Sequence, residues 1–177
     1  MKINKIHVVD DIINLKKQEE IKNNLLGNDF NWHYINDISH NDGVQKRPAF
    51  SHYFVLDEEI NSDFNYLTND IIVNSCKTVD IDCNKVIESR TFLQLPLHDN
   101  ITKGDLVDTP HIDRETEHTV ILYYVQTADG DTIIYDNDKE HKITPKQGRV
   151  VIFNGSLKHT ATQPIDGSRC IININIC

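Results

Sequence analysis

Three residues in the C-terminal half of the chain have the types and spacing of a metal site. His111 and Asp113 flank Ile112, and in an extended segment residues i and i+2 point to the same side. An imidazole and a carboxylate are therefore placed side by side, with Ile112 turned away. A third ligand must come from elsewhere, and His159, on a short predicted strand after a turn, is the candidate.

Two histidines and one carboxylate on one face of an octahedron leave three positions open, which is typical of non-haem Fe(II) oxygenases. Zinc could use the same three residues, usually in a tetrahedral site. The triplet at 111–113 also arises often by chance, and a surface turn with a capping Asp would need no metal. His159 taken alone is equally compatible with an ordinary strand histidine.

Arg169 adds a reason to favour the oxygenase chemistry. It follows His159 beyond a predicted turn at 164–167 and starts the next predicted strand. Antiparallel pairing of these two strands would place Arg169 beside the strand that contains His159. A planar guanidinium can bind a carboxylate through two hydrogen bonds. Arg169 is thus suited to hold the far end of a dicarboxylate whose 2-oxo acid end chelates the metal.

The elements that must position these side chains are strands. After residue 85 the sequence is rich in Ile, Val, Thr, Tyr and Phe, in short runs separated by turn signals such as ADGD, PKQG and PIDG. Short strands at this spacing favour an antiparallel sandwich or barrel. The predicted strands are 86–97, 117–126, 131–136, 149–153, 158–163 and 168–176.

Before residue 85 the pattern is helical. One helix is predicted from about 11 to 26, with Asp10 or Asp11 as its N-cap. A second is predicted from about 57 to 77, with Asp57 as its N-cap and an apolar stripe along one side. The polar stretch between the two helices predicts irregular structure or short strands.

Length and cysteine usage define the class of protein. A chain of 177 residues is long enough for one domain with a core and too short for two full ones. We therefore expect a single domain, with a helical support region at 1–85 whose helices pack outside one sheet, and a β core at 86–177. The four cysteines form no CxxC pair, which excludes zinc-ribbon and thioredoxin motifs and predicts free thiols in a reducing compartment.

Charge and hydropathy argue against several partners. The formal net charge is −9, which disfavours nonspecific attraction to nucleic acid or to an anionic membrane. No apolar run approaches the roughly 20 residues needed to cross a bilayer, and the N-terminus lacks the features of a secretory signal. These properties predict a cytoplasmic protein that does not enter a membrane.

The order of the motifs resembles the Fe(II)/2-oxoglutarate-dependent oxygenases, especially their prolyl 4-hydroxylase-like branch. Four segments match in order: HID at 111–113, HTVILYYVQTADGDTIIYD at 118–136, ITPKQGRVVIFNGSLKHTATQP at 143–164 and GSR at 167–169. The resemblance implies a mainly β fold with supporting α elements, in which N-terminal helices flank a double-stranded β-helix (jelly-roll or cupin-like) core. The short chain is similar to phage or bacterial members, which implies the cytoplasm, or the host cytoplasm for a phage-encoded protein.

The resemblance also implies roles for individual residues. Arg169 would pair with the distal carboxylate of 2-oxoglutarate. Tyr124 matches a tyrosine that in some members bonds the same carboxylate, and an inward-facing core aromatic is the alternative. Asn173 shares a strand face with Arg169 and would line the cosubstrate pocket, or be a polar residue satisfied within the sheet. The implied iron ligands are His111, Asp113 and His159.

Two positions depart from the family pattern. Many prolyl 4-hydroxylases of the collagen type have Lys where this chain has Arg169, which argues against a collagen-like substrate. The strand before the metal motif often contributes a tyrosine near the cosubstrate, whereas this chain has Gln94-Leu95-Pro96 there, with Gln94 as the candidate replacement. The loop at 98–110 is either a lid over the site or an ordinary solvated loop.

The activity that the resemblance implies is hydroxylation with Fe(II), 2-oxoglutarate and O2, with ascorbate as an optional reductant. The favoured substrate is a protein or peptide side chain such as proline, and Trp32 is a candidate recognition residue. The alternatives are an oxygenase for a small molecule or a nucleobase, and a non-enzymatic, cupin-like metal-binding module. Arg169 separates these classes, because a metal-binding module needs no carboxylate anchor. The sequence assigns no oligomeric state.

Overall fold

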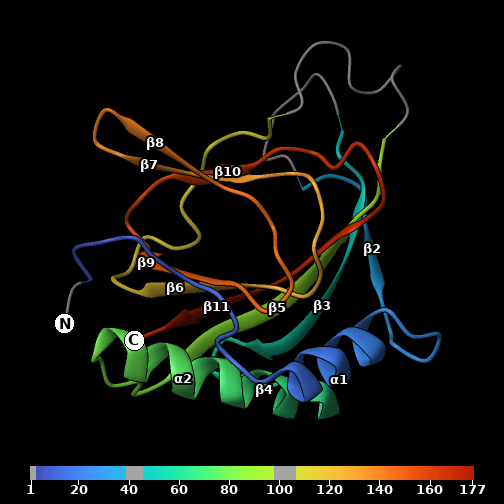
Figure 1. Ribbon diagram of the computed structural model, residues 1–177, viewed down its shortest axis with the longest axis horizontal. Helices are drawn as coiled ribbons and strands as arrows, with labels where there is room; N and C mark the ends of the chain where they lie inside the picture. The colour runs from blue at the N-terminus through green and yellow to red at the C-terminus, as the bar shows by residue number, and fades with distance from the viewer. Residues whose placement is uncertain (1–2, 39–45, 98–106) are drawn as a thin grey trace.

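The computed structural model describes residues 3–38, 46–97 and 107–177 (Figure 1). Most of the candidate lid, residues 98–106, lies outside the described residues. The elements in chain order are β1 (His7–Val9), α1 (Leu15–Leu25), β2 (His33–Ile35), β3 (Ala49–Leu56), β4 (Glu59–Ile60), the 3-10 helix η1 (Asp63–Thr68), α2 (Asn69–Val79), β5 (Val86–Gln94), β6 (Thr119–Tyr124), β7 (Thr132–Asp136), β8 (Lys139–Ile143), β9 (Val150–Asn154), β10 (His159–Ala161) and β11 (Arg169–Ile176).

Two antiparallel sheets form the β core. The larger sheet has the order β1-β9-β6-β11-β5-β3-β2, with β4 paired to β3, and the smaller has the order β10-β7-β8. Bridges from Val107 to Thr162 and from His111 to His159 extend the β10 edge of the smaller sheet. The central strands β9-β6-β11-β5 thus face a layer of four segments. This is a double-stranded β-helix with N-terminal helices, so the predicted fold class is confirmed.

The two α-helices cover the outer face of the larger sheet, on the side opposite β7, β8 and β10 (Figure 1). Their apolar residues Ile21, Leu25 and Ile71 belong to one buried cluster with outward-facing residues of β6 and β11, such as Tyr123 and Ile172. Alternate residues of these strands point the other way, toward the smaller sheet. Among the described residues, no helix is long and apolar enough to cross a membrane.

Both helices begin later than the sequence predicted. The N-cap of α1 is Asn14, whose side-chain oxygen accepts a hydrogen bond from the backbone N–H of Lys17 at 3.0 Å. Asp11 instead has a left-handed φ of 53° and accepts a hydrogen bond from the Gln18 side chain. Asp57 is likewise no helix cap, because it lies in the tight β3–β4 turn with a φ of 49°. Asp11 and Asp57, which the sequence predicted as helix caps, therefore lie in turns next to the helices.

The N-terminal half contributes strands as well as helices. Residues 49–56 form the eight-residue strand β3, which pairs along β5, where the sequence predicted irregular structure or short strands. The prediction also missed β8, whose sequence KEHKI is largely exposed and charged. As an edge strand with one hydrogen-bonded neighbour, β8 tolerates charged side chains that a central strand would exclude. Its local composition therefore resembled a turn.

Candidate metal and cosubstrate site

A cavity of about 210 Å³ lies between the two sheets and contains the predicted site. The strands β5 and β11 supply one wall, and β10 with residues 107–113 supplies the opposite wall. Apolar side chains of Phe92, Leu122 and Ile171 line part of it. Six of the eight residues singled out in the sequence line this cavity, and Tyr124 and Trp32 do not; the six are Gln94, His111, Asp113, His159, Arg169 and Asn173.

The three candidate metal ligands converge at one end of the cavity. Their ligand atoms all lie within 4.8 Å of one another. The Nε2 atoms of His111 and His159 are 3.7 Å and 3.5 Å from Oδ1 of Asp113. Reciprocal backbone hydrogen bonds of 3.0 Å and 2.8 Å between His111 and His159 fix the spacing of the two imidazoles. The side chain of Ile112 is turned away and partly exposed, as the alternation predicted.

Backbone carbonyls orient both imidazoles. Nδ1 of His111 donates to the carbonyl oxygen of Thr109, and Nδ1 of His159 donates to that of Leu157, each at 3.2 Å. With the proton on Nδ1, the Nε2 lone pair of each ring faces Asp113. A carbonyl that accepts from the non-coordinating nitrogen is the usual way in which proteins set the tautomer of a metal-binding histidine.

The Asp113 carboxylate is buried and half satisfied. The Asn173 side-chain amide donates to Oδ2 at 2.8 Å, whereas Oδ1, which faces the two imidazoles, has no hydrogen-bond partner. Burial works to raise the pKa of Asp113, whereas the His159 ring in its charged form, the Asn173 amide and the charge of Arg90 outweigh it and hold the pKa below its usual range. An ionised, buried oxygen without a partner is costly unless a cation binds it. The donor set therefore fits a divalent metal ion.

Arg169 lies in the same cavity and is almost fully buried, with 3% of its surface exposed. Its Nε donates to the Gly130 carbonyl at 2.8 Å, Nη1 to the Gln94 side chain at 2.7 Å, and Nη2 to the Thr132 hydroxyl at 2.8 Å. All three partners are neutral. Within the described parts of the chain, no carboxylate lies within ion-pair distance of this guanidinium, and burial lowers its pKa. Such a cation is preorganised for a carboxylate that the chain does not supply.

The route by which Arg169 reaches the site differs from the prediction. The strand β10, which contains His159, pairs with β7, whereas β11 pairs with β5 and β6 in the other sheet. The two strands are therefore not paired neighbours, and this part of the prediction was wrong. The connection at 162–168 crosses from one sheet to the other, so Arg169 faces the His159 strand across the cavity. Because the two sheets face each other, the side chains of His159 and Arg169 line the same cavity although their strands are not paired.

Tyr124 and Gln94 support Arg169 from two sides. The Tyr124 hydroxyl donates to Oγ1 of Thr132 at 2.7 Å, and its ring lies 5.9 Å from the Arg169 guanidinium carbon. The ring is fully buried, and burial raises the pKa of the hydroxyl. Gln94 is the cross-strand neighbour of Arg169 and accepts its hydrogen bond directly. The position that lacks the family's tyrosine is thus filled by an amide that contacts Arg169.

A buried polar network beside the cavity had no counterpart among the sequence predictions. Asp108 accepts hydrogen bonds from the Gln163 amide at 2.9 Å and 2.8 Å and lies 3.5 Å from Nε of Arg47. The Thr160 hydroxyl donates to the Asp108 backbone carbonyl at 2.6 Å, which ties the segment before His111 to β10. Burial raises the pKa of Asp108 to about 6. Single polar residues in loops form no recognisable pattern, so this network could be found only from the structure.

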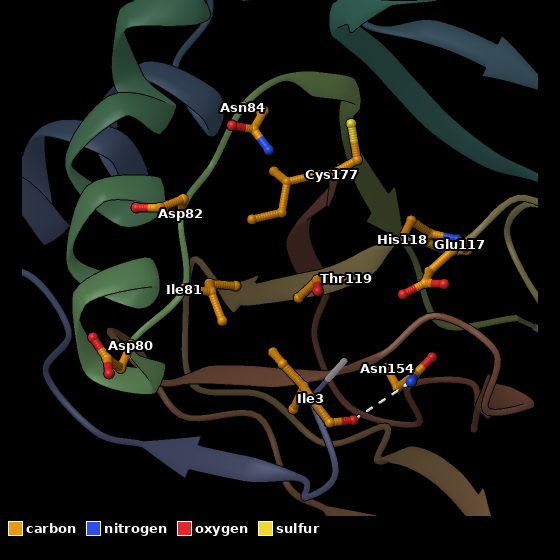
Figure 2. Close-up of a pocket in the computed structure, with 11 residues that line it drawn as sticks. Ile3, Asp80, Ile81, Asp82, Asn84, Glu117, His118, Thr119, Asn154 and Cys177 are labelled. Carbon is orange, nitrogen blue, oxygen red and sulfur yellow. Dashed lines mark hydrogen bonds between the residues drawn. The ribbon is translucent and has the colours of Figure 1, made fainter. Parts of the chain in front are cut away.

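His118 and Trp32 lie away from the metal ligands. His118 lines a separate cavity of about 470 Å³, together with Asp80, Asp82 and Asn154 (Figure 2). Its Nδ1 donates to the Thr116 carbonyl at 2.7 Å, and its ring packs so closely on Gly155 that no larger residue fits there. Trp32 packs edge-to-face on Phe30 and donates to the Leu25 carbonyl. Trp32 therefore has a packing role in the fold.

Known proteins are similar to this chain in part of its sequence and in its fold. Residues 98–177 match the family described as the 2OG-Fe(II) oxygenase superfamily. No curated protein matches the sequence. Solved structures share the fold at low sequence identity. A prolyl hydroxylase from Trichoplax adhaerens, in complex with a hypoxia inducible factor oxygen degradation domain peptide fragment, has a TM-score of 0.71 and 13% identity over 98% of this chain and 83% of its own.

Two bacterial structures are similar to the same extent. A 2OG-Fe(II) oxygenase family oxidoreductase from Burkholderia pseudomallei has a TM-score of 0.73 and 8% identity, and covers 97% of this chain and 84% of its own. A prolyl-4-hydroxylase from Pseudomonas putida has a TM-score of 0.63 and 10% identity, and covers 97% of this chain and 91% of its own. At these identities the structures establish the shared fold alone, and the family match covers residues 98–177, less than half of the chain.

Proposed function

We propose that the chain is a 2-oxoglutarate-dependent dioxygenase that hydroxylates a protein or peptide side chain, supported by the match of residues 98–177 to the 2OG-Fe(II) oxygenase superfamily. The observation that supports this most strongly is the buried Arg169, which shares one cavity with two histidines and a carboxylate. The described residues give this guanidinium no carboxylate partner. A dicarboxylate that chelates the metal with one end could supply that partner with its other end. A metal-binding module would have no use for this guanidinium.

The proposed iron ligands are His111, Asp113 and His159. Each offers one atom on the same side of the cavity, and three protein ligands leave open positions for a chelating cosubstrate and O2. Asn173 would act as a positioning residue, because its amide holds Oδ2 of Asp113 and so leaves Oδ1 turned toward the metal position. Partners of this kind commonly tune metal affinity.

The proposed 2-oxoglutarate site runs from the metal to Arg169. The guanidinium would bind the distal carboxylate, and the Tyr124 hydroxyl and the Thr132 hydroxyl would complete its hydrogen bonds. Gln94 would hold Arg169 in place. Phe92 and its cross-strand neighbour Ile171 lie between the two ends and would contact the methylene groups of the cosubstrate.

In this arrangement the protein and the bound groups would have different roles in the reaction. Bound Fe(II) with 2-oxoglutarate and O2 supplies the oxidising power that replaces a substrate C–H by C–OH, while 2-oxoglutarate becomes succinate and CO2. The side chains hold the two ends of the cosubstrate and keep each imidazole in one tautomer. The apolar walls at Phe92, Leu122 and Ile171 exclude water from the reacting centre.

The size of the cavity supports a substrate that inserts one small group. A cavity of about 210 Å³ must hold the cosubstrate as well as the reacting part of the substrate. A single side chain of a peptide, such as proline, fits this limit, and so does a small molecule. The net charge of −9 argues against nucleic acid, which makes a nucleobase the weaker alternative. All four cysteines are free thiols, which suits the reducing cytoplasm as the proposed location.

Succinate formation from 2-oxoglutarate tests the proposal. Protein purified without O2 and loaded with Fe(II) is exposed to O2, alone and with a library of proline-containing peptides. We expect slow, iron-dependent succinate formation that a substrate peptide stimulates and that both His111→Ala and Arg169→Ala abolish. Succinate formation that survives in both variants, or no binding of 2-oxoglutarate by the native protein, would contradict the proposal.

A further inference from the structure

Arg90 is a second arginine in the cavity, and the proposed reaction leaves it without a role. It lies on β5 four residues before Gln94, so both side chains point to the inner face of the larger sheet. Its cross-strand neighbour on β11 is Asn173, as that of Gln94 is Arg169. The inner face therefore presents Arg169 at one end of this pair of strands and Arg90 near its middle.

Arg90 lies on the side of the metal ligands, away from Arg169. Four residue steps along β5 lead from Arg90 to Gln94, a distance of roughly 13 Å. Arg169, beside Gln94, is at the end proposed for the distal cosubstrate carboxylate. Arg90 lies further along the strands, beside the Asn173 that holds Asp113. If 2-oxoglutarate spans from Arg169 to the metal as proposed, Arg90 lies at the metal end of that span and lines the cavity where the reacting group of the substrate would enter.

Surrounding side chains hold the Arg90 guanidinium in one place. Its Nη1 donates to the Tyr53 hydroxyl at 3.1 Å, and its Nε is 3.1 Å from a carboxylate oxygen of Glu88. The guanidinium also stacks over the rings of Phe92 at 4.6 Å and Tyr53 at 5.7 Å. A long cation held by a ring on two sides loses little conformational freedom when it binds a ligand. Arg90 is thus preorganised.

Its hydrogen-bonding capacity is only partly used. The described residues give Nη2 no hydrogen-bond partner, and 20% of the side chain is exposed. Glu88 does not belong to Arg90 alone, since its other oxygen lies 3.6 Å from Nη1 of Arg114. One carboxylate therefore serves two guanidinium groups. A planar guanidinium with an open edge can bind the two oxygens of a carboxylate through paired hydrogen bonds.

We propose that Arg90 determines substrate specificity by binding a carboxylate of the substrate beside the metal. This inference rests on the proposed function, because it takes the Arg169 end to be occupied by 2-oxoglutarate. The carboxylate has two sources with the same chemistry, an acidic side chain of a peptide or the α-carboxylate of an amino acid. When either carboxylate binds to Arg90, a substrate carbon a few atoms away from that carboxylate would lie at the reacting centre.

Binding of matched acid and amide probes tests the proposal. The enzyme is loaded with Fe(II) and saturating 2-oxoglutarate without O2, and affinities are measured by calorimetry. One pair is N-acetyl-L-proline and N-acetyl-L-prolinamide, for an α-carboxylate. The other is acetyl-Gly-Glu-Gly-amide and acetyl-Gly-Gln-Gly-amide, for a side-chain carboxylate. Succinate formation with each probe is then followed after O2 is admitted.

The expected result is that at least one acid binds about tenfold or more tightly than its amide. Arg90→Gln should reduce that ratio to near one, and Arg90→Lys should restore part of it. Arg114→Gln is the matched control, because Arg114 contacts the same Glu88 but does not line the cavity. It should keep the native ratio.

Two results would overturn the inference. One is that neither acid is preferred over its amide by the native enzyme, and the other is that the preference survives in Arg90→Gln. Titration of 2-oxoglutarate into the same samples separates these outcomes from a failure of the proposed function. A native enzyme that binds no 2-oxoglutarate overturns the function itself, whereas normal binding without an acid preference overturns only the role of Arg90.

Discussion

The two faces of the larger sheet are made by the same strands and differ in what they do. Along β11, Ile172 and Ile174 point outward and pack under the helices, whereas Arg169 and Asn173 point inward to the cavity. On β6, outward-facing Tyr123 alternates with cavity-lining Leu122 in the same way. The outer face gains stability from apolar burial, and the inner face gives up part of that gain to keep polar groups for ligands.

The cost of the inner face is visible in its unpaired atoms. Oδ1 of Asp113 and Oδ1 of Asn173 are buried without a hydrogen-bond partner. Arg169 is buried without a carboxylate among the described residues. A bound metal ion would satisfy Oδ1 of Asp113, and a bound carboxylate would satisfy Arg169, so the proposed ligands should stabilise the fold as well as start the chemistry. Substitutions on the two faces should accordingly separate activity from stability.

The largest effect is expected at the inner face, for Asp113→Ala. This change removes the only acidic member of the proposed metal site, so metal binding and succinate formation should both be lost. The metal-free variant should unfold at the same temperature as the metal-free native protein or at a higher one, because a buried unsatisfied carboxylate oxygen is gone. Metal analysis and thermal unfolding check this, with the exposed Asp138→Ala as control. Retained metal would refute the assignment.

Arg169→Gln should raise the KM for 2-oxoglutarate by about 100-fold, with a smaller effect on kcat. A charged hydrogen-bonded pair that loses one partner costs about 2–5 kcal/mol, and 100-fold corresponds to ~2.7 kcal/mol. Steady-state succinate formation at increasing 2-oxoglutarate concentration measures both constants. Arg169→Lys keeps the charge but loses the planar guanidinium. Its KM should therefore lie between that of the native enzyme and that of Arg169→Gln. An unchanged KM in Arg169→Gln would remove Arg169 from the site.

Ile172→Ala tests the outer face. The Ile172 side chain is fully buried under the helices, so its truncation should lower the free energy of unfolding by about 2–5 kcal/mol. Urea denaturation measures this loss. At temperatures where the variant is folded, its KM for 2-oxoglutarate should match that of the native enzyme. If instead Ile172→Ala changed the KM as strongly as Arg169→Gln does, the proposed separation between the faces would not hold.

Sequence patterns predicted the side chains of the site better than the strands around them. The spacing of His111 and Asp113 follows from strand alternation, which depends only on neighbouring residues. The start of β11 at Arg169 was likewise clear from a local turn signal. The strand that β11 pairs with was not, because pairing is decided between residues far apart in the chain. For the same reason β3 was missed, although it is one of the longest strands.

The partners of the predicted residues could be inferred only in part. Gln94 stood out because it replaced an expected tyrosine, and it does contact Arg169. Arg90 shares its strand face, but the sequence offered no reason to single out one arginine near the start of a strand. Asp108 lies in a loop, where neither periodicity nor a motif applies. Its burial depends on Arg47 and Gln163, which come from distant parts of the chain.

The smallest effect is expected from the pH dependence of Asp108, at the edge of the inner face. Burial raises its pKa in the folded state to about 6, above the ordinary value of 3.8. The folded state therefore holds the proton more tightly, and stability should fall as pH rises from about 4 to about 6 and then stay level. The change should be at most about 3 kcal/mol, because one pKa unit corresponds to about 1.4 kcal/mol. Asp108→Asn should remove it in urea denaturation across this pH range, and an identical pH profile in the variant would contradict the prediction.

The measurement that tests the central claim most directly compares the binding of 2-oxoglutarate and glutarate, which lacks the 2-oxo group, to Fe(II)-loaded enzyme without O2. Both ligands can reach Arg169, but only 2-oxoglutarate can also chelate the metal. Calorimetry should show that the native enzyme prefers 2-oxoglutarate, that His159→Ala loses this preference, and that Arg169→Gln weakens both ligands alike. If the preference survives without His159, or if Arg169→Gln leaves both affinities unchanged, the inner face does not hold the cosubstrate as proposed.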